Sequence, residues 1–300
     1  MMRSCIGAEY LGRYCHFSPT STTPKMVNWH DSVLVLRDYL ALIKLNHSLA
    51  GIYIWETVFT MGFELDVLRG KRPYTWTIWP YLGTRYFGLA AFIVFFVDTD
   101  GGKVPCQPLI VANYALPYVS WACASLIIVI RVIAIWNRHI IMSSIAIATL
   151  LAGLGLNIRN LTMVDASYDP ILQTCITLKT HRGLTNAIAV LVVDIVLLAA
   201  MLIGLLRHAH RSSTGLWYLL YQQCIIWIAL AGIAEIPPVV FLILDLNDPW
   251  NEMFTGVAIT ILSIGAARMY RALCKRGSLT EYSSEPAPEL IRTAVFDLPG

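Results

Sequence analysis

Long apolar runs separated by short polar segments dominate this chain. A membrane-spanning helix needs about 20 consecutive, mostly apolar residues. Membrane β-strands would instead appear as alternating segments of about ten residues, whereas the runs here are continuous. The pattern therefore predicts an all-α fold, a polytopic membrane bundle of seven transmembrane helices. The seven runs are 40–64, 75–97, 110–136, 139–158, 184–206, 217–244 and 252–273.

Composition supports the bilayer as the solvent of this chain. Of the 300 residues, 57% are hydrophobic and 14% are charged, and the mean hydropathy is +0.61. Soluble domains are roughly 45–50% apolar and about 25% charged. The net charge of +3 and the lack of a long basic tract give no indication of nucleic-acid binding. Composition alone does not separate a receptor, an enzyme and a channel.

The short loops predict an orientation. Lys and Arg are enriched in cytosolic loops, and here they gather in the odd-numbered loops and after the last run. The segment 1–36 is then extracellular or lumenal and mostly disordered. The seven helices occupy residues 37–275, and the polar tail 276–300 is cytosolic and disordered. The membrane is the plasma membrane or the endoplasmic reticulum. The basic residues of the odd loops are Arg69, Lys71, Arg72, Arg138, Arg207 and Arg211.

Two of the seven cysteines lie in predicted outer loops. Cys106 falls in the second loop and Cys175 in the fourth, on the side of the membrane where disulfides persist. We expect these two cysteines to pair and to tie the third helix to the fourth loop. Asn160-Leu161-Thr162 is a glycosylation sequon at the membrane surface on the same side.

Ionisable residues within the spans are costly, and by default they mark functional or paired positions. At about 1.5 Å per residue, Glu56 lies about 12 Å and Arg85 about 15 Å from the cytosolic ends of the first two helices. We expect a Glu56–Arg85 ion pair, most simply as a structural clamp between these helices.

A second group of ionisable residues lies nearer the outer surface. Asp194 is near the middle of the fifth helix, Glu235 precedes Pro237-Pro238 in the sixth, and His47 is in the outer half of the first. Consecutive prolines remove two backbone donors and kink or open a helix. We therefore hypothesise an outward-facing polar pocket that holds Asp194, Glu235 and His47. The alternative is that each carboxylate bonds a neighbour such as Lys44.

Such a pocket is compatible with several chemistries. Two carboxyl groups could supply a general acid, bind a cationic or hydroxylated ligand, or relay protons. No His/Glu spacing on one helix matches a metal-ligand pair, and no nucleotide-binding loop or haem motif is visible, so no metal or cofactor is predicted.

Several stretches of the chain resemble a family of seven-helix membrane proteins from mushroom-forming (basidiomycete) fungi. The resemblance implies the same fold and a fungal origin, and it implies no mechanism. The matching stretches are IYIWETVFTMGFE (52–64), RGKRPYTWTIW (69–79), RVIAIWN (131–137), DIVLLAAMLIGLLR (194–207), AEIPPVVF (234–241) and LNDPWNEMF (246–254).

Two looser resemblances suggest mechanisms. The seven-helix plan with an outer Cys106–Cys175 bridge is similar to that of G-protein-coupled receptors. This chain has Ile130-Arg131-Val132 where those receptors have Asp-Arg-Tyr. Trp55-Glu56 looks like the Trp-Glu signature of membrane-bound terpene cyclases of fungal secondary metabolism, which implies Glu56 together with Asp194 or Glu235 as catalytic acids.

The main prediction is a receptor-like bundle that binds a small ligand in the outward-facing pocket, with a cytosolic protein as a partner. Asp194, Glu235 and His47 would contact the ligand. The first alternative is a cyclase-like enzyme acting on an isoprenoid-like substrate, and the second is a channel or scaffold. The lipid bilayer is a partner in every case.

Overall fold

The computed structural model describes residues 32–70, 75–100, 105–169, 174–178, 180–209 and 215–282. Within these residues, each of the helices α3 to α8 contains a segment long and apolar enough to cross a membrane. The predicted all-α polytopic bundle is therefore confirmed. The helices are α1 (Ser32–Phe59), α2 (Met61–Leu68), α3 (Ile78–Asp100), α4 (Cys106–Ile135), α5 (Ile140–Thr162), α6 (Leu184–Ala209), α7 (Gly215–Leu244) and α8 (Asp248–Tyr282).

Helix α1 packs beside α3 and α8 and completes the bundle, although its charged residues set it apart from the six more apolar helices. The predicted first span, 40–64, is divided at Thr60, because α1 ends at Phe59 and α2 starts at Met61. The Thr60 hydroxyl donates to the Glu56 carbonyl at 2.6 Å. Such back-bonding of Ser and Thr side chains competes with the helical ladder and often bends helices.

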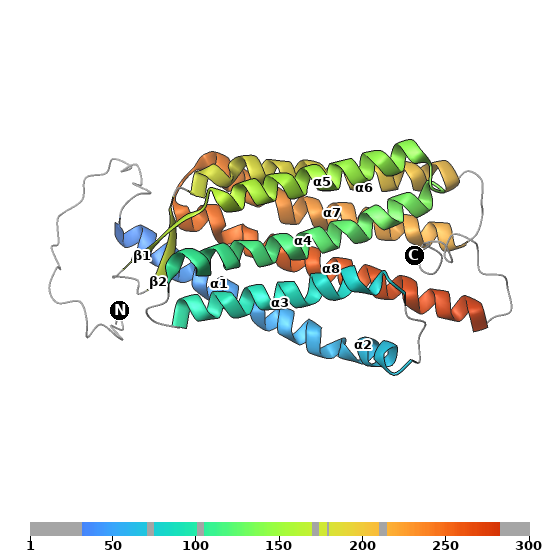
Figure 1. Cartoon of the computed structure of the whole chain (residues 1–300), viewed down its shortest axis with the longest axis horizontal. Coiled ribbons are helices and arrows are strands. Elements are labelled where there is room, and N and C mark those ends of the chain that lie inside the picture. The colour runs from blue at the N-terminus through green and yellow to red at the C-terminus, as the bar shows by residue number, and fades with distance from the viewer. Residues whose placement is uncertain are drawn as a thin grey trace, which may run out of the picture.

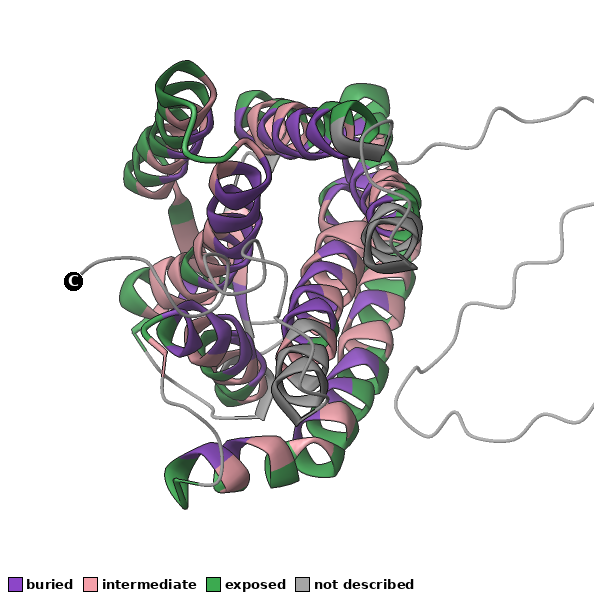
Figure 2. Cartoon of the chain, turned by 90° about the vertical axis from the view of Figure 1, so that its right-hand side faces the viewer, coloured by how far each residue is buried: buried purple, intermediate pink, exposed green. Residues whose placement is uncertain are grey.

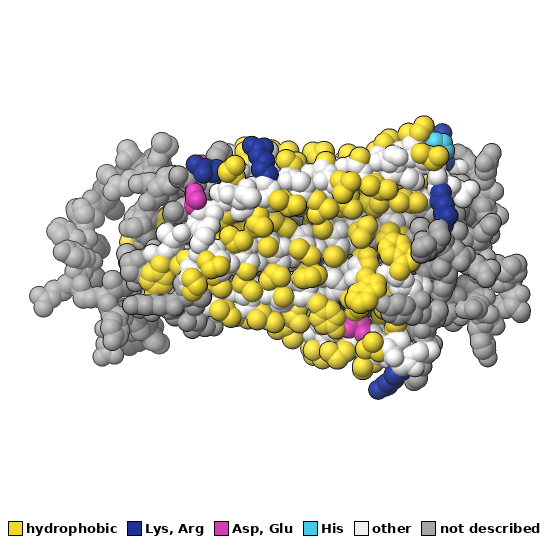
Figure 3. Space-filling model, in the orientation of Figure 1, with side chains coloured by type: hydrophobic (Ala, Val, Ile, Leu, Met, Phe, Trp, Pro, Cys, Tyr) yellow, Lys and Arg dark blue, Asp and Glu magenta, His cyan; other side chains and the backbone are white. Residues whose placement is uncertain are grey.

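The long helices run roughly along one axis, and the hairpin described below lies at one end of the bundle (Figure 1). Buried residues face the inside of the bundle and exposed residues face outward (Figure 2). Hydrophobic side chains cover the middle of the face in Figure 3, and most of its charged side chains lie toward the two ends. A surface of this kind suits a hydrocarbon solvent.

Helix α4 occupies the centre of the bundle, where it packs against α3, α5, α6 and α8. Its buried residues include Ile128 and Val132, and they join one core cluster with Leu197 of α6 and Trp227 of α7. Close packing of α7 against α8 depends on Gly265, because a Cβ there would lie 1.8 Å from Trp227 Cζ3.

A β-hairpin follows α5, where the sequence had predicted only a loop. Strand β1 (Asp165–Asp169) pairs antiparallel with β2 (Thr174–Leu178). The run Thr-Cys-Ile-Thr-Leu of β2 is rich in the β-branched residues that favour strands. The Gln107 side chain holds β1, because its Nε2 donates to the Val164 carbonyl at 2.8 Å and its Oε1 accepts from the Ala166 amide at 3.1 Å.

The expected Cys106–Cys175 disulfide is present, with a Cα–Cα distance of 5.4 Å. It joins the first turn of α4 to β2, opposite Tyr168 of β1. The disulfide therefore fixes the hairpin over the end of the bundle.

The first and last helices extend past the expected boundaries of the bundle at both ends. Residues 32–36 of the expected N-terminal segment already belong to α1, and α8 continues to Tyr282, past the expected boundary at 275. The expected end of the last helix came from the end of its apolar run. The helical backbone continues into the polar residues that follow this run. Residues 1–31 and 283–300, and the basic residues Lys71, Arg72 and Arg211, lie outside the described residues. The orientation and the choice of membrane stay predictions.

Candidate functional site

A cavity of about 160 Å³ lies within the hairpin end of the bundle. We call it the hairpin cavity. Its wall comes from α4, α5, α6, α7 and α8, together with β2 and the short 3₁₀ helix η1 (Thr180–Gly183). Much of the wall is apolar and includes Pro117, Val190, Leu242 and Leu262. The polar groups of the wall come from Tyr114, Tyr118, Trp121, Asn160, Thr177, Arg182, Asn186, Glu235, Asn251, Glu252, Thr255 and Ser263.

Two of the predicted carboxylates meet at the wall of the hairpin cavity. Asp194 of α6 and Glu235 of α7 are 3% and 5% exposed, and their carboxyl groups lie close enough to influence each other. Asp194 also accepts from Trp121 Nε1 at 3.0 Å and from Ser125 Oγ at 3.2 Å. Trp121 and Glu235 line the cavity, so Asp194 lies behind them. The alternative pairing with Lys44 is not what the structure shows.

Both side chains of this pair are acids, and both are buried. Burial and a nearby like charge each disfavour the ionised form of a carboxyl group. The pair thus places two acidic side chains at the wall of a mostly apolar cavity.

Glu235 lies just before the double proline, yet α7 is continuous from Gly215 to Leu244. The helix is not broken there as the sequence had suggested. Pro237 and Pro238 have no N–H, so the carbonyls of Ile233 and Ala234 lack their usual helical donors. The prolines therefore leave two carbonyl oxygens near Glu235 without their helical hydrogen bonds, while the helix itself continues.

Tyr114 of α4 donates a hydrogen bond to the Glu252 carboxylate of α8. Both residues line the hairpin cavity and also a second cavity of about 160 Å³. This neighbouring cavity lies toward α1 and α3, against Tyr39 and Phe92. The Tyr114–Glu252 pair thus stands between the two cavities.

Sequence reasoning missed Glu252 as a site residue. Its signal was present, since Glu252 lies in the first turns of the last span, at the outer level already assigned to Glu235. The predicted last span starts at Glu252 itself, and an acid at the first position of a span does not indicate whether its side chain faces the bundle interior or the outer surface.

Tyr118 connects three helices at the same cavity. Its hydroxyl accepts from Asn160 Nδ2 of α5 at 2.7 Å and lies 3.3 Å from Asn186 Nδ2 of α6. Asn160 lies in the last turns of α5 with its amide bonded to Tyr118, which is unlike the surface loops of acceptor sequons, and glycosylation there stays a prediction.

Two buried acceptor oxygens of the cavity wall have no hydrogen-bond partner among the described residues. They are Glu235 Oε1 and Asn186 Oδ1. An unsatisfied buried polar group costs about 1–3 kcal/mol, so such atoms call for an explanation. A hydrogen-bond donor inside the cavity would supply one.

His47 does not belong to this site. Its side chain is exposed on α1 and lines neither cavity. One ring nitrogen lies 2.8 Å from the Ile43 carbonyl, and the ring packs on Phe96 at a centroid distance of 4.8 Å. The prediction was wrong because residue counting gives depth in the membrane but not the face of the helix.

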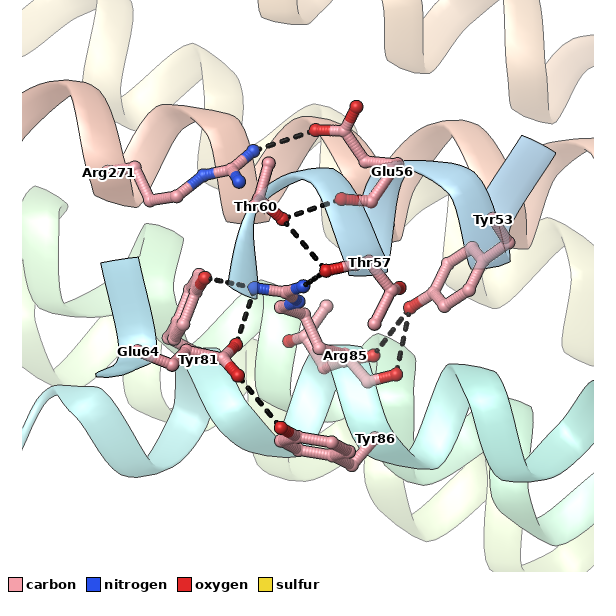
Figure 4. Close-up of polar contacts among 10 residues, drawn as sticks. Tyr53, Glu56, Thr57, Thr60, Glu64, Tyr81, Arg85, Tyr86 and Arg271 are labelled. Atoms are coloured by element: carbon pink, nitrogen blue, oxygen red, sulfur yellow. Dashed lines mark hydrogen bonds and ion pairs between the residues drawn. The ribbon is translucent and has the colours of Figure 1, made fainter. Parts of the chain in front are cut away.

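The predicted Glu56–Arg85 ion pair is also wrong (Figure 4). Arg85 pairs with Glu64, whose carboxylate lies 2.5 Å from Arg85 Nη1, and both side chains are buried. The Arg85 guanidinium also donates to the Tyr81 hydroxyl and the Thr57 carbonyl, each at 2.6 Å. Depth suggested the partner, but Glu56 projects toward α8, whereas Glu64 of α2 reaches Arg85. Arg85 of α3 is therefore clamped to the first two helices as expected, but its acidic partner is Glu64 and not Glu56.

Glu56 instead pairs with two arginines of α8. Its carboxylate lies 2.7 Å from Arg268 Nη2 and 2.8 Å from Arg271 Nη2. It lines neither cavity at the hairpin end. Glu56 therefore cannot act together with Asp194 or Glu235 on one substrate, as the resemblance to cyclases implied.

Within the described residues, no group of three His, Cys, Asp or Glu side chains could hold a metal ion. No protein-family model matches the chain, and no curated protein does. The class that the fold defines is an integral membrane helical protein, and its polar cavity lies beneath a disulfide-anchored hairpin. The resemblance to the fungal seven-helix family stays a prediction.

Proposed function

We propose that this protein is a receptor-like membrane protein that binds a small, mostly apolar molecule carrying an amine or hydroxyl group in the hairpin cavity. The observation that carries the proposal is the pair of acceptors without a partner among the described residues, Glu235 Oε1 and Asn186 Oδ1, in a mostly apolar wall. An apolar pocket with a few convergent polar groups is the usual form of a ligand site.

The size of the cavity limits the ligand. A cavity of about 150 Å³ holds a benzene-sized molecule, and the hairpin cavity has about 160 Å³. The acids Glu235 and Glu252 favour a donor group on the ligand. A single ring with a short polar arm would fill the space and reach the acceptors.

A series of three molecules of similar shape tests this proposal. Purified protein in detergent would be unfolded thermally with phenethylamine, 2-phenylethanol or ethylbenzene. We expect the amine or the alcohol to raise the midpoint temperature and ethylbenzene to have a smaller effect. A ligand present at about 100 times its Kd adds about 2.7 kcal/mol of stability. Equal shifts from all three molecules would show that the acceptors play no part.

The Asp194–Glu235 pair also supports a second candidate, an enzyme of the cyclase type acting on an isoprenoid-like substrate. A carboxyl group that holds a proton beside an apolar cavity can protonate an alkene or epoxide as a general acid. In this reading Glu235 contacts the substrate and Asp194 positions it. Membranes containing the protein would be incubated with a polyprenyl epoxide, and cyclised product that disappears in Glu235→Gln would favour the enzyme. No product together with amine-dependent stabilisation would favour the receptor-like reading.

A further inference from the structure

A groove of about 390 Å³ lies between α1 and α8, away from the hairpin cavity. We call it the α1–α8 groove. From α1 it is lined by Trp55, Glu56 and Phe59, and from α8 by Ile264, Arg268 and Arg271. None of these six residues lines the hairpin cavity, so the proposed ligand site does not involve them.

The charges of the α1–α8 groove do not balance. The Glu56 carboxylate accepts from Arg268 Nε at 3.0 Å and from Nη2 at 2.7 Å, and Arg271 Nη2 binds the same carboxylate at 2.8 Å. Two guanidinium groups thus face one carboxylate, which leaves one positive charge. The Arg268 side chain is 67% exposed. Among the described residues Arg271 Nη1 is buried and has no acceptor.

The wall beside these charges is an exposed apolar surface. The Trp55 and Phe59 side chains are 71% and 76% exposed, and their rings stack at a centroid distance of 6.2 Å. On a helix of a membrane bundle, aromatic side chains with this exposure pack against lipid chains and anchor at the interface.

The groove lies at the right depth for a lipid headgroup. Arg268 is four residues before Ala272, where the apolar span of α8 ends, so it lies about 6 Å from that end. A long Arg side chain covers such a distance by extending its head toward the interface. Phosphate is a preferred partner of the guanidinium fork.

We propose that the α1–α8 groove binds one anionic phospholipid, with its phosphate on Arg268 and Arg271 and an acyl chain against Trp55 and Phe59. The excess positive charge favours an anionic headgroup over a zwitterionic one. The aromatic wall distinguishes a lipid from a soluble phosphate. Basic pockets between membrane helices bind anionic headgroups by the same combination.

Native mass spectrometry of the full-length chain tests this proposal. The protein would be released from micelles that contain equal amounts of phosphatidylglycerol and phosphatidylcholine with the same acyl chains, and the ratio of the two bound lipids would be measured. We expect wild type to retain phosphatidylglycerol, and Arg268→Gln to lower the ratio roughly five-fold, the effect of one basic residue near an anionic surface. The matched control is Arg207→Gln, because Arg207 is also exposed near a helix end but lies over the Trp136 ring outside the groove.

Glu56→Gln gives a test of opposite sign. Removal of the competing carboxylate leaves both arginines for the phosphate, so we expect the ratio to rise. If Glu56 served only to hold α1 on α8, the variant would lose stability without gaining anionic lipid. A drop in the ratio for Glu56→Gln, or equal ratios for the Arg268 and Arg207 variants, would overturn the proposal. Complete competition by glycerol 3-phosphate at the concentration of the lipid would show a phosphate site that needs no lipid, and would also overturn it.

Discussion

The Tyr114 hydroxyl on α4 and the Glu252 carboxylate on α8 form the contact that separates the two cavities at the hairpin end. The pair unites residues 138 positions apart in sequence. A hydrogen bond to a charged group contributes about 1.5–3 kcal/mol to stability.

Replacement of Tyr114 by Phe removes this hydrogen bond and keeps the ring. We expect Tyr114→Phe to lower the free energy of unfolding by about 1.5–3 kcal/mol. Thermal unfolding of the purified protein measures the change. Tyr168→Phe on the exposed face of the hairpin is the control, with an expected change within about 0.5 kcal/mol. A loss of the same size in both variants would contradict a specific role of the pair.

The buried carboxyl pair predicts unequal effects for its two amide variants. Asp194→Asn places a donor NH₂ where the carboxylate accepts from Trp121 and Ser125, so we expect a loss of about 1–3 kcal/mol. Glu235→Gln removes one of two neighbouring buried acids and breaks no hydrogen bond to Trp121 or Ser125, so we expect a smaller loss of stability. Thermal unfolding of both variants decides the point, and a larger loss for Glu235→Gln would mean that the roles of the two acids are reversed.

Loss of the Cys106–Cys175 disulfide should weaken the hairpin end. The disulfide closes a loop of 69 residues, for which a chain-entropy model gives on the order of 4 kcal/mol. We expect Cys106→Ser with Cys175→Ser to lower the unfolding temperature and to reduce stabilisation by phenethylamine or 2-phenylethanol, because Thr177 of β2 lines the cavity. Cys123→Ser, which removes a free thiol, is the control.

The Glu64–Arg85 pair should show strong coupling in a double-mutant cycle. Breaking a buried ion pair by removing one partner costs about 3–5 kcal/mol, and replacing both costs less because no unpaired charge remains. We therefore expect Arg85→Gln to be more destabilising than Glu64→Gln with Arg85→Gln. The control pair is Arg182–Asp165, whose side chains are 54% and 59% exposed, and its cycle should give at most about 1 kcal/mol. Additive effects at Glu64 and Arg85 would show that the contact contributes little.

Much of the fold could be predicted because spanning helices leave a signal in local composition. The run from Leu184 to Leu206 needs only its length and apolarity to be identified as a helix. The Cys106–Cys175 disulfide could also be predicted, since the loop charges placed both cysteines on one side of the membrane.

The partners of the charged residues could not be predicted in the same way. Counting residues placed Glu56 and Arg85 at similar depth, but an α-helix turns by about 100° per residue, and the face on which a side chain emerges depends on the packing of the whole bundle. The same limit applies to His47, which lies at a suitable depth on an outward face. Asp194 and Glu235 could be grouped because each is a lone acid in an apolar helix and must find a polar partner inside the bundle.

The Tyr118 hydroxyl adds a constraint on the chemistry of the hairpin cavity. Its oxygen serves as the acceptor for Asn160 and faces the amide nitrogen of Asn186, so its own hydrogen is not used in these contacts. A phenol can donate one hydrogen bond while it accepts others, and no acceptor for this hydrogen is found among the described side chains. The cavity therefore offers a donor as well as acceptors. An alcohol can satisfy both kinds of group, whereas an ammonium ion can only donate, so of the two probes 2-phenylethanol should match the hydrogen-bonding pattern of the wall more completely.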